Sequence, residues 1–161
     1  MNPEKNNFLF ISTGHKRIGL PFLMNIFSKL NPDKYELFVA GNKFDSNLPN
    51  VKSLGFIQKT NELYNIADCL LHPASYEAFG QVVTESLICG TPVFVSDRVG
   101  AKEIVKNSEG LVLPFNHEKK WLNAIHNFDK NKVVAKSQLV DELNIVQHID
   151  KMLSNWDKYK A

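Results

Sequence analysis

Two glutamates eight residues apart lie in the stretch Glu77-Ala-Phe-Gly-Gln-Val-Val-Thr-Glu85-Ser-Leu-Ile-Cys-Gly-Thr-Pro-Val93. Short apolar runs flank this stretch, at Cys69–His72 before it and at Val93–Ser96 after it. Strands that are buried on both faces of a parallel sheet are apolar in this way. Between the runs, Gly80 precedes a segment with the composition of a helix. The sequence therefore predicts a strand, loop, helix, turn and strand of an α/β fold.

The loop that carries Glu77 is predicted to lie at a ligand-binding edge. A right-handed crossover places this loop at the carboxyl end of the first strand, and open α/β sheets bind ligands at that edge. Free amides of the first helical turn, near Phe79, Gly80 and Gln81, favour an anion such as a phosphate, as does the helix dipole. We therefore expect one site to hold an anion at the helix end and hydroxyl groups at the two glutamates.

Glu85 lies inside the predicted helix among apolar residues. No Lys or Arg occurs between Glu77 and Arg98, so no cation nearby in the sequence offsets its charge. A carboxylate in apolar surroundings is costly unless something binds it, and the vicinal hydroxyls of a sugar are a suitable partner. The alternative is that Glu85 lies on a solvated helix edge, as most glutamates do. The surrounding motifs favour the ligand.

A basic pair follows the first predicted strand, in Gly14-His-Lys16-Arg17-Ile-Gly19. It is expected at the same sheet edge as Glu77, where a cation stabilises a leaving diphosphate. The two glycines form neither a G-x-G-x-x-G motif nor a P-loop. The alternative for the pair is a solvated loop position.

The rest of the chain continues the alternation of strands and helices, although residues 41–50 form a turn-rich loop without a helix. Strands are predicted at residues 8–12, 35–40, around Gly55-Phe56 and at 111–113, and helices at 20–30, 61–66 and near 102–106. Two or three helices are predicted from His117 to the end. The last of them, Ile145–Tyr159, either packs on its own domain or crosses to another one.

Composition narrows the possible classes of protein. The chain has 161 residues, 43% of them hydrophobic and 22% charged, which predicts one globular domain. Its net charge of +2 is too small to indicate nucleic acid or a membrane surface as the main partner. Cys69 and Cys89 are predicted to be core thiols in a reducing compartment. No signal peptide or membrane span is predicted, and no Asp-x-Asp motif or metal-ligand spacing is present, so no metal or other cofactor is predicted.

The sequence resembles glycosyltransferase family 4. The motifs that carry the resemblance are Ala67-Asp68-x-Leu-Leu-His-Pro73, Glu77-x7-Glu85 with Phe79-Gly80, Gly90-Thr-Pro-Val93, Gly100-Ala-Lys-Glu103, Gly110-Leu-Val-Leu113 and Val51-Lys-Ser-Leu-Gly55-Phe56. They extend over roughly residues 8–128. The resemblance implies a Rossmann-like, doubly wound parallel sheet that forms the C-terminal, donor-binding half of a retaining GT-B enzyme. The expected domain spans residues 1–161, with further helices at about 129–160, and the amino-terminal acceptor domain is absent.

The resemblance also implies roles for the residues of the site. Glu77 is expected to contact sugar hydroxyls, Glu85 the ribose, and Lys16 and Arg17 the leaving group. The family's Arg-Lys-Gly is one residue out of register here, so that role is assigned to the pair. The expected donor-binding residues are Gly14, Ala78, Phe79, Gly80, Gln81, Val82 and Glu85. The catalytically implicated histidine of the family belongs to the absent domain, and His72 is predicted to be a hydrogen-bonded structural residue.

The predicted partner is a nucleoside diphosphate sugar, preferably a UDP-sugar, that donates to an acceptor glycan. Leu71-His-Pro-Ala74 together with Phe8-Leu-Phe-Ile-Ser-Thr13 is similar to the lipopolysaccharide core glucosyltransferases. Alternatives are a noncatalytic nucleotide-binding module and another GT-B enzyme, such as a nucleotide-sugar epimerase or a phosphorylase. We expect the protein in the cytoplasm or peripherally at the inner face of the membrane, which it would contact only through the absent domain. Alone, it is expected to bind the donor without transferring sugar.

Overall fold

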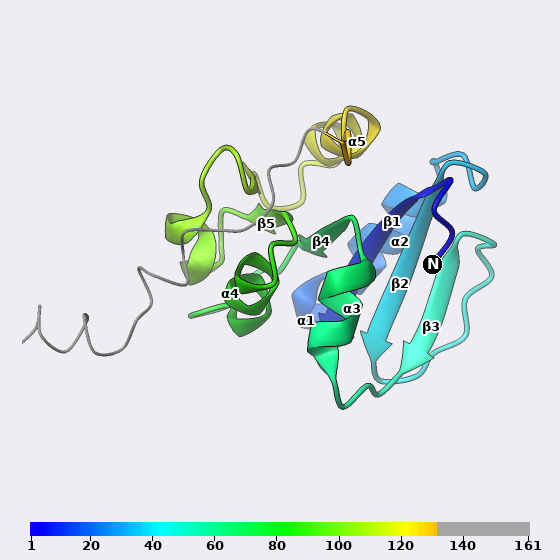
Figure 1. Ribbon diagram of the computed structural model, residues 1–161, viewed down its shortest axis with the longest axis horizontal. Coiled ribbons are helices and arrows are strands. Elements are labelled where there is room, and N and C mark those ends of the chain that lie inside the picture. Colours follow the sequence, from blue (N-terminus) through cyan, green and yellow to red (C-terminus); the bar gives the residue numbers. More distant parts are fainter. Residues whose placement is uncertain (132–161) are drawn as a thin grey trace, which may run out of the picture.

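A six-stranded parallel sheet forms the centre of the molecule (Figure 1). The structure is a computed structural model and describes residues 1–131. Its strands are β1 (Asn6–Ser12), β2 (Tyr35–Gly41), β3 (Val51–Gly55), β4 (Cys69–His72), β5 (Val93–Ser96) and β6 (Gly110–Leu113). Their order is β3-β2-β1-β4-β5-β6. The winding reverses between β1 and β4, so the switch point of this doubly wound sheet lies there.

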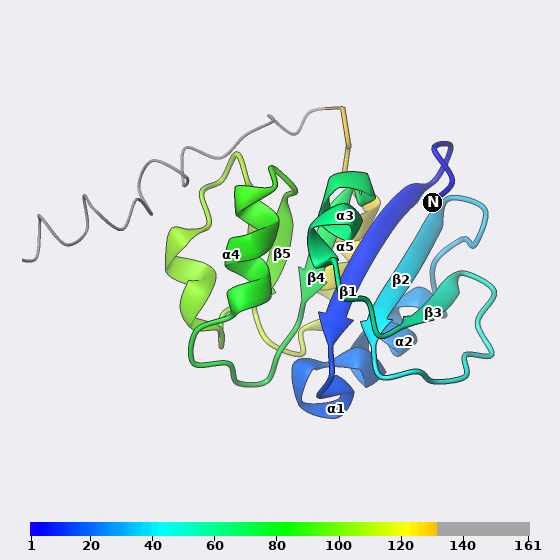
Figure 2. The ribbon, with the colours of Figure 1, turned by 60° about the horizontal axis from the view of Figure 1, so that its bottom comes forward.

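Helices cover both faces of the sheet. They are α1 (His15–Ile18), α2 (Leu20–Phe27), α3 (Thr60–Ile66), α4 (Gln81–Ile88), the 3₁₀ helix η1 (Gly100–Ile104) and α5 (Glu118–His126). Helices α3 and α4 pack side by side on one face, and α2 and α5 pack together on the other (Figures 1 and 2). The predicted Rossmann-like, doubly wound parallel sheet is therefore confirmed. The helices predicted at about 129–160, including Ile145–Tyr159, lie outside the described residues.

Apolar strands and aromatic rings build the core. Strands β4 and β5 are buried along their whole length, as predicted from their composition. Phe8 in β1 contacts the rings of Phe27 and Phe128, with centroids 6.0 and 5.4 Å apart. Phe56 is 76% exposed and Phe79 61% exposed, so core packing does not account for every phenylalanine. Both exposed rings belong to loops at the carboxyl ends of strands.

Two predicted helices differ from the observed ones, and the segment with the basic pair is helical where a loop was predicted. The predicted helix at 20–30 ends at Phe27, and the helix near 102–106 is a 3₁₀ helix that begins at Gly100. The basic pair lies on the helical turn α1 rather than in an open loop. Gly19, with φ of 99°, separates α1 from α2. A Cβ atom at Gly19 would lie 2.6 Å from the carbonyl oxygen of Pro73, so only glycine fits this junction.

The connection between β2 and β3 is the turn-rich loop predicted for residues 41–50. It is tied to the segment after β1, because the side-chain amide of Asn42 donates to the Thr13 carbonyl oxygen at 2.7 Å. The ring of Phe44 packs edge-on against His15, with centroids 5.6 Å apart. This loop connects β2 and β3 without a helix. Its side chains lie at the edge where doubly wound sheets bind ligands.

Candidate functional site

A cleft of about 290 Å³ opens at the switch point of the sheet, where β1 and β4 end. Its walls come from the loop after β1, the end of β4 and the start of α4. The lining residues are Ile11, Ser12, Thr13, Gly14, Arg17, Ile18, His72, Glu77, Gly80, Gln81 and Val82. Six of them were predicted from the sequence, namely Gly14, Arg17, Glu77, Gly80, Gln81 and Val82. The ligand edge deduced from the crossover rule is thus a cleft in the structure.

Arg17 and Glu77 face each other in this cleft. A guanidinium nitrogen of Arg17 lies 3.5 Å from a Glu77 carboxylate oxygen. The same guanidinium donates to the Tyr76 carbonyl oxygen at 2.9 Å, and the Ser75 hydroxyl donates to the Arg17 carbonyl oxygen at 3.0 Å. These contacts join the loop after β1 to the loop that carries Glu77. The pair therefore presents a cation and an anion side by side at the mouth of the cleft.

Lys16 does not line this cleft. It lines a neighbouring cavity whose other walls include Phe22, Asn25 and Phe115. Of the predicted basic pair, only Arg17 lines the cleft beside Glu77.

The glutamate loop is braced by the segment before η1. The Glu77 amide donates to the Arg98 carbonyl oxygen at 3.3 Å, and the Gly100 amide donates to the Glu77 carbonyl oxygen at 3.0 Å. A Cβ atom on Gly100 would lie 2.1 Å from the Ala78 carbonyl oxygen. Glycine at this position lets the two backbones approach each other. Sequence reasoning noted this motif only as part of the family resemblance, and its bracing role comes from the structure.

The start of α4 offers free backbone donors. Within residues 1–131, the N–H groups from Ala78 to Val82 donate to no protein acceptor. Gly80 caps the helix with φ of 91°, and a Cβ atom there would lie 2.6 Å from a Val99 methyl carbon. Gly80 and Gln81 line the cleft, so the donors and the positive end of the helix dipole adjoin it. This agrees with the amides expected for an anion.

Glu85 has a partner that the sequence did not reveal. It is half-buried, and the Tyr64 hydroxyl on α3 donates to its carboxylate at 2.9 Å. The sequence predicted that no nearby cation offsets the charge of Glu85, and it did not predict this hydroxyl donor. Helix α4 is also less buried than expected, because Ile88 is 45% exposed and Cys89 is half-buried. Glu85 does not line the cleft and lies further along α4.

The Gly90-Thr-Pro motif holds Tyr64 in place. The Thr91 hydroxyl donates to the Tyr64 carbonyl oxygen at 2.6 Å, and the Ser86 hydroxyl donates to the Thr91 carbonyl oxygen at 3.0 Å. Burial raises the pKa of Tyr64 well above its ordinary value, and the Glu85 carboxylate adds to this effect. Tyr64 thus stays protonated and remains a donor to Glu85 across the physiological pH range.

Tyr64→Phe is expected to lower the free energy of unfolding by about 1.5 kcal/mol, because it removes a hydrogen bond to a carboxylate. Glu85→Gln is expected to cost less, since the amide oxygen still accepts from the Tyr64 hydroxyl. Urea denaturation of both single variants and the double variant would give the coupling energy. Strictly additive effects would contradict the interaction.

Comparison with known proteins shows the family to which the chain belongs. Residues 1–161 match the family model described as Glycosyl transferases group 1. The chain belongs to this family. Among curated relatives, the chain is 32% identical over 101 residues to the "Probable transglycosylase BTH_I0986" of Burkholderia thailandensis. That match covers 63% of this chain and 28% of the relative, so the chain spans a minor part of the relative's length.

Solved structures share the fold of this group 1 glycosyltransferase chain. Anabaena Alr3699/HepE in complex with UDP-glucose has a TM-score of 0.75 and 21% identity, over 94% of this chain and 49% of that chain. WaaG, a glycosyltransferase involved in lipopolysaccharide biosynthesis, has a TM-score of 0.69 and 23% identity, over 82% of this chain and 39% of that chain. At these identities the likeness shows the fold alone, and it agrees with the predicted Rossmann-like half of a GT-B enzyme.

His72 lies in the cleft of this glycosyltransferase chain and is almost completely buried, with 2% of its surface exposed. Neither ring nitrogen has a hydrogen-bond partner among the residues that the structure describes. The prediction of a hydrogen-bonded structural histidine is therefore wrong in this respect. Burial and, to a smaller extent, the nearby charge of Arg17 lower the pKa of His72 to about 4. The imidazole is neutral at pH 7.

This pKa predicts acid sensitivity of the glycosyltransferase fold. Between pH 6.5 and about 4 the unfolded chain binds a proton at His72 that the folded protein does not bind. The free energy of unfolding should fall with pH in this window, by up to about 1.4 kcal/mol per pH unit from this residue. Above pH 6.5 the imidazole is neutral in both states and contributes no slope. Urea denaturation of the wild type and of His72→Leu at several pH values would measure the difference, and parallel curves would contradict it.

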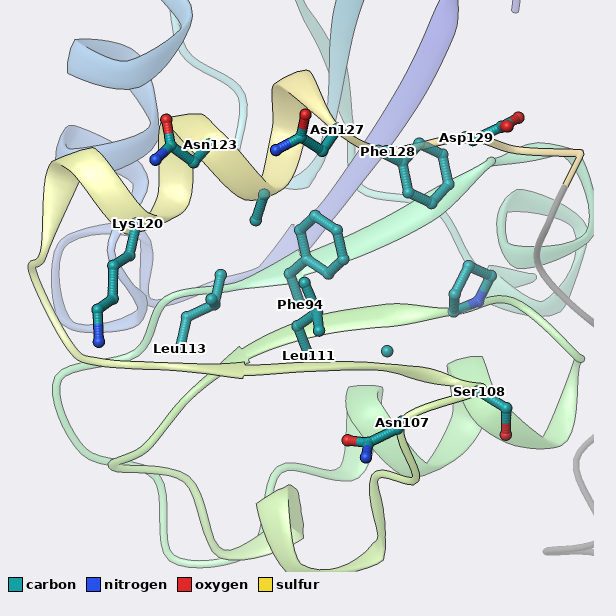
Figure 3. A pocket seen from close by; sticks show the side chains of 13 residues that line it. Phe94, Asn107, Ser108, Leu111, Leu113, Lys120, Asn123, Asn127, Phe128 and Asp129 are labelled. Carbon is teal, nitrogen blue, oxygen red and sulfur yellow. The ribbon is translucent and has the colours of Figure 1, made fainter.

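A larger cavity, of about 490 Å³, holds none of the predicted site residues of the glycosyltransferase. Leu111 and Leu113 from β6 line it opposite Lys120, Asn123 and Asn127 on the α5 side (Figure 3). In the described part of the chain, no group of three or more His, Cys, Asp or Glu side chains is placed to hold a metal ion. None of the helices within residues 1–131 is long and apolar enough to cross a membrane.

Proposed function

We propose that the chain is the donor-binding part of a retaining glycosyltransferase of family 4, and that it binds a nucleoside diphosphate sugar. The observation that carries the proposal is the cleft in which Arg17, Glu77 and the free amides at the start of α4 meet. One ligand that needs a cation, backbone donors and a carboxylate together is a sugar linked to a diphosphate. The solved complex of Alr3699/HepE with UDP-glucose supports a UDP-sugar.

Each group in the cleft has a role in this proposal. The amides from Ala78 to Val82 and the Arg17 guanidinium bind the diphosphate, and Arg17 stabilises the charge that develops when the sugar leaves. The Glu77 carboxylate accepts hydrogen bonds from sugar hydroxyls. Glu85, held by Tyr64, binds the hydroxyls of the ribose. Lys16 lines the neighbouring cavity, so the proposal assigns the phosphate contact to Arg17.

The acceptor is proposed to bind to a further part of the enzyme. Transfer requires that the acceptor is held against the anomeric carbon, and such positioning supplies roughly 7–11 kcal/mol of barrier lowering. The chain covers 39% of WaaG and 49% of Alr3699/HepE, which supports a second half that completes the cleft. The acceptor would be a lipopolysaccharide or another glycan, and the sugar transferred a hexose. No metal is needed in this proposal.

Calorimetric titration with UDP and UDP-glucose in the presence of a chelator tests the proposal. We expect binding of both ligands without added metal, and slow or no transfer of glucose by residues 1–161 alone. Absence of binding at millimolar ligand, or binding that the chelator abolishes, would contradict it. Product analysis after mixing with a separately produced acceptor-binding half would separate a transferase from a noncatalytic nucleotide-binding module.

A further inference from the structure

The floor of the cleft holds a buried imidazole without a partner. His72 ends β4 and pairs in register with Val95 of β5, and its side chain lines the same cleft as Gly14, Arg17 and Glu77. Neither ring nitrogen meets a hydrogen-bonding atom among residues 1–131. Buried polar groups in native proteins nearly always have hydrogen-bond partners, so a buried side chain without any partner requires an explanation.

The polar groups at this end of the sheet make their hydrogen bonds and ion pair with other partners, and none of them bonds to His72. The Ser12 hydroxyl oxygen accepts from the Gly14 amide at 2.9 Å. The Ser96 hydroxyl donates to the Ala74 carbonyl oxygen at 2.6 Å, and the Glu77 carboxylate pairs with Arg17 at 3.5 Å. The ring nitrogens of His72 thus lack a partner within residues 1–131, and the side chain lines the cleft, where a bound ligand can supply one.

The surroundings indicate what that ligand group is. The cleft is lined by Arg17 and by Gly80 and Gln81 at the free amide end of α4, all of which favour negative charge. A second cation at His72 would be disfavoured by burial and by Arg17. A neutral imidazole, in contrast, carries one N–H donor without adding charge. The group that matches an N–H donor beside a cation and backbone amides is a phosphate oxygen.

We propose that His72 is a donor-binding residue whose neutral imidazole donates a hydrogen bond to the diphosphate of the bound nucleotide sugar. This inference rests on the proposed function and adds a contact that the paired glutamates and the basic residues do not supply. It also explains why a buried polar group is kept in the ligand-free protein: the hydrogen bond missing there forms when the diphosphate binds.

The test compares His72→Leu, which removes the donor at similar volume, with His72→Gln, which keeps an N–H donor. His126→Leu serves as the control, because His126 is exposed on α5 and does not line the cleft. We expect His72→Leu to raise the melting temperature of the ligand-free chain and to weaken binding of UDP and UDP-glucose about tenfold. Binding of uridine should be unchanged, and His72→Gln should recover part of the affinity. His126→Leu should bind like the wild type.

The outcomes separate this inference from the proposed function. If the wild type binds UDP and His72→Leu binds it equally well, the role of His72 is wrong and the proposed function stands. Equal losses for UDP and uridine would also overturn it, since His72 would then only shape the cleft. Failure of the wild type to bind any of the ligands would overturn both. If the variants do not fold, the ring ¹H–¹⁵N signals of wild-type His72 decide, because UDP should shift them and an unchanged spectrum would overturn the contact.

Discussion

Arg17→Ala is expected to weaken binding of UDP by about 10- to 100-fold, whereas Lys16→Ala should change it by less than about twofold. A charge-assisted hydrogen bond contributes about 1.5–3 kcal/mol, and tenfold in affinity corresponds to about 1.4 kcal/mol. Of these two basic residues, only Arg17 lines the cleft. Its removal also leaves Glu77 without the cation that lies 3.5 Å away, so an unpaired carboxylate would then face the diphosphate. Both effects act in the same direction.

Calorimetric titration of the two single variants with UDP and with uridine measures this difference. Lys16→Ala is the matched control, because it removes a neighbouring positive charge without changing the cleft. Uridine lacks the diphosphate and should bind both variants like the wild type. Equal losses for Lys16→Ala and Arg17→Ala would show that the long-range charge of the pair matters and not the contact. Equal losses for UDP and uridine would place Arg17 away from the phosphates.

Gly100→Ala is expected to destabilise the protein by on the order of 3–4 kcal/mol, in the range of severe steric substitutions. The added Cβ atom would lie 2.1 Å from the Ala78 carbonyl oxygen and 3.4 Å from the Phe79 Cα atom. The obstacle is backbone, which cannot rotate away as a side chain can. The glutamate loop would have to move, and with it Glu77 and the amides of α4. The variant should therefore also bind UDP more weakly.

Gly14→Ala is the matched control for this substitution. Its Cβ atom would meet nothing closer than 3.8 Å, and Gly14 has a negative φ that alanine can adopt. We expect its free energy of unfolding to stay within about 0.5 kcal/mol of the wild type. Urea denaturation of both variants measures the difference, and similar stabilities would show that the glutamate loop is not held against Gly100.

Much of the scaffold could be predicted because it depends on local patterns. Strands β4 and β5 are short apolar runs bounded by turn residues, and both were predicted with the observed bounds. The crossover rule then located the cleft without any contact being known. Helix ends were predicted less well, since the helix predicted at 20–30 ends at Phe27 and the one predicted near 102–106 begins at Gly100. The helical turn α1 was not predicted, and Gly19, which ends it, lies against Pro73, a residue far away in the chain.

The sequence by itself determined the parallel sheet, the sheet edge at which the cleft opens, and six of the residues that line this cleft, since periodicity and motif spacing are properties of neighbouring residues. Only the tertiary structure decided which of them meet. Lys16 and Arg17 are adjacent, but successive side chains on a helical turn such as α1 point about 100° apart, so one lines the cleft and the other does not. Tyr64 reaches Glu85 because α3 packs on α4. Contacts of this kind arise when separate elements pack, and no local pattern encodes them.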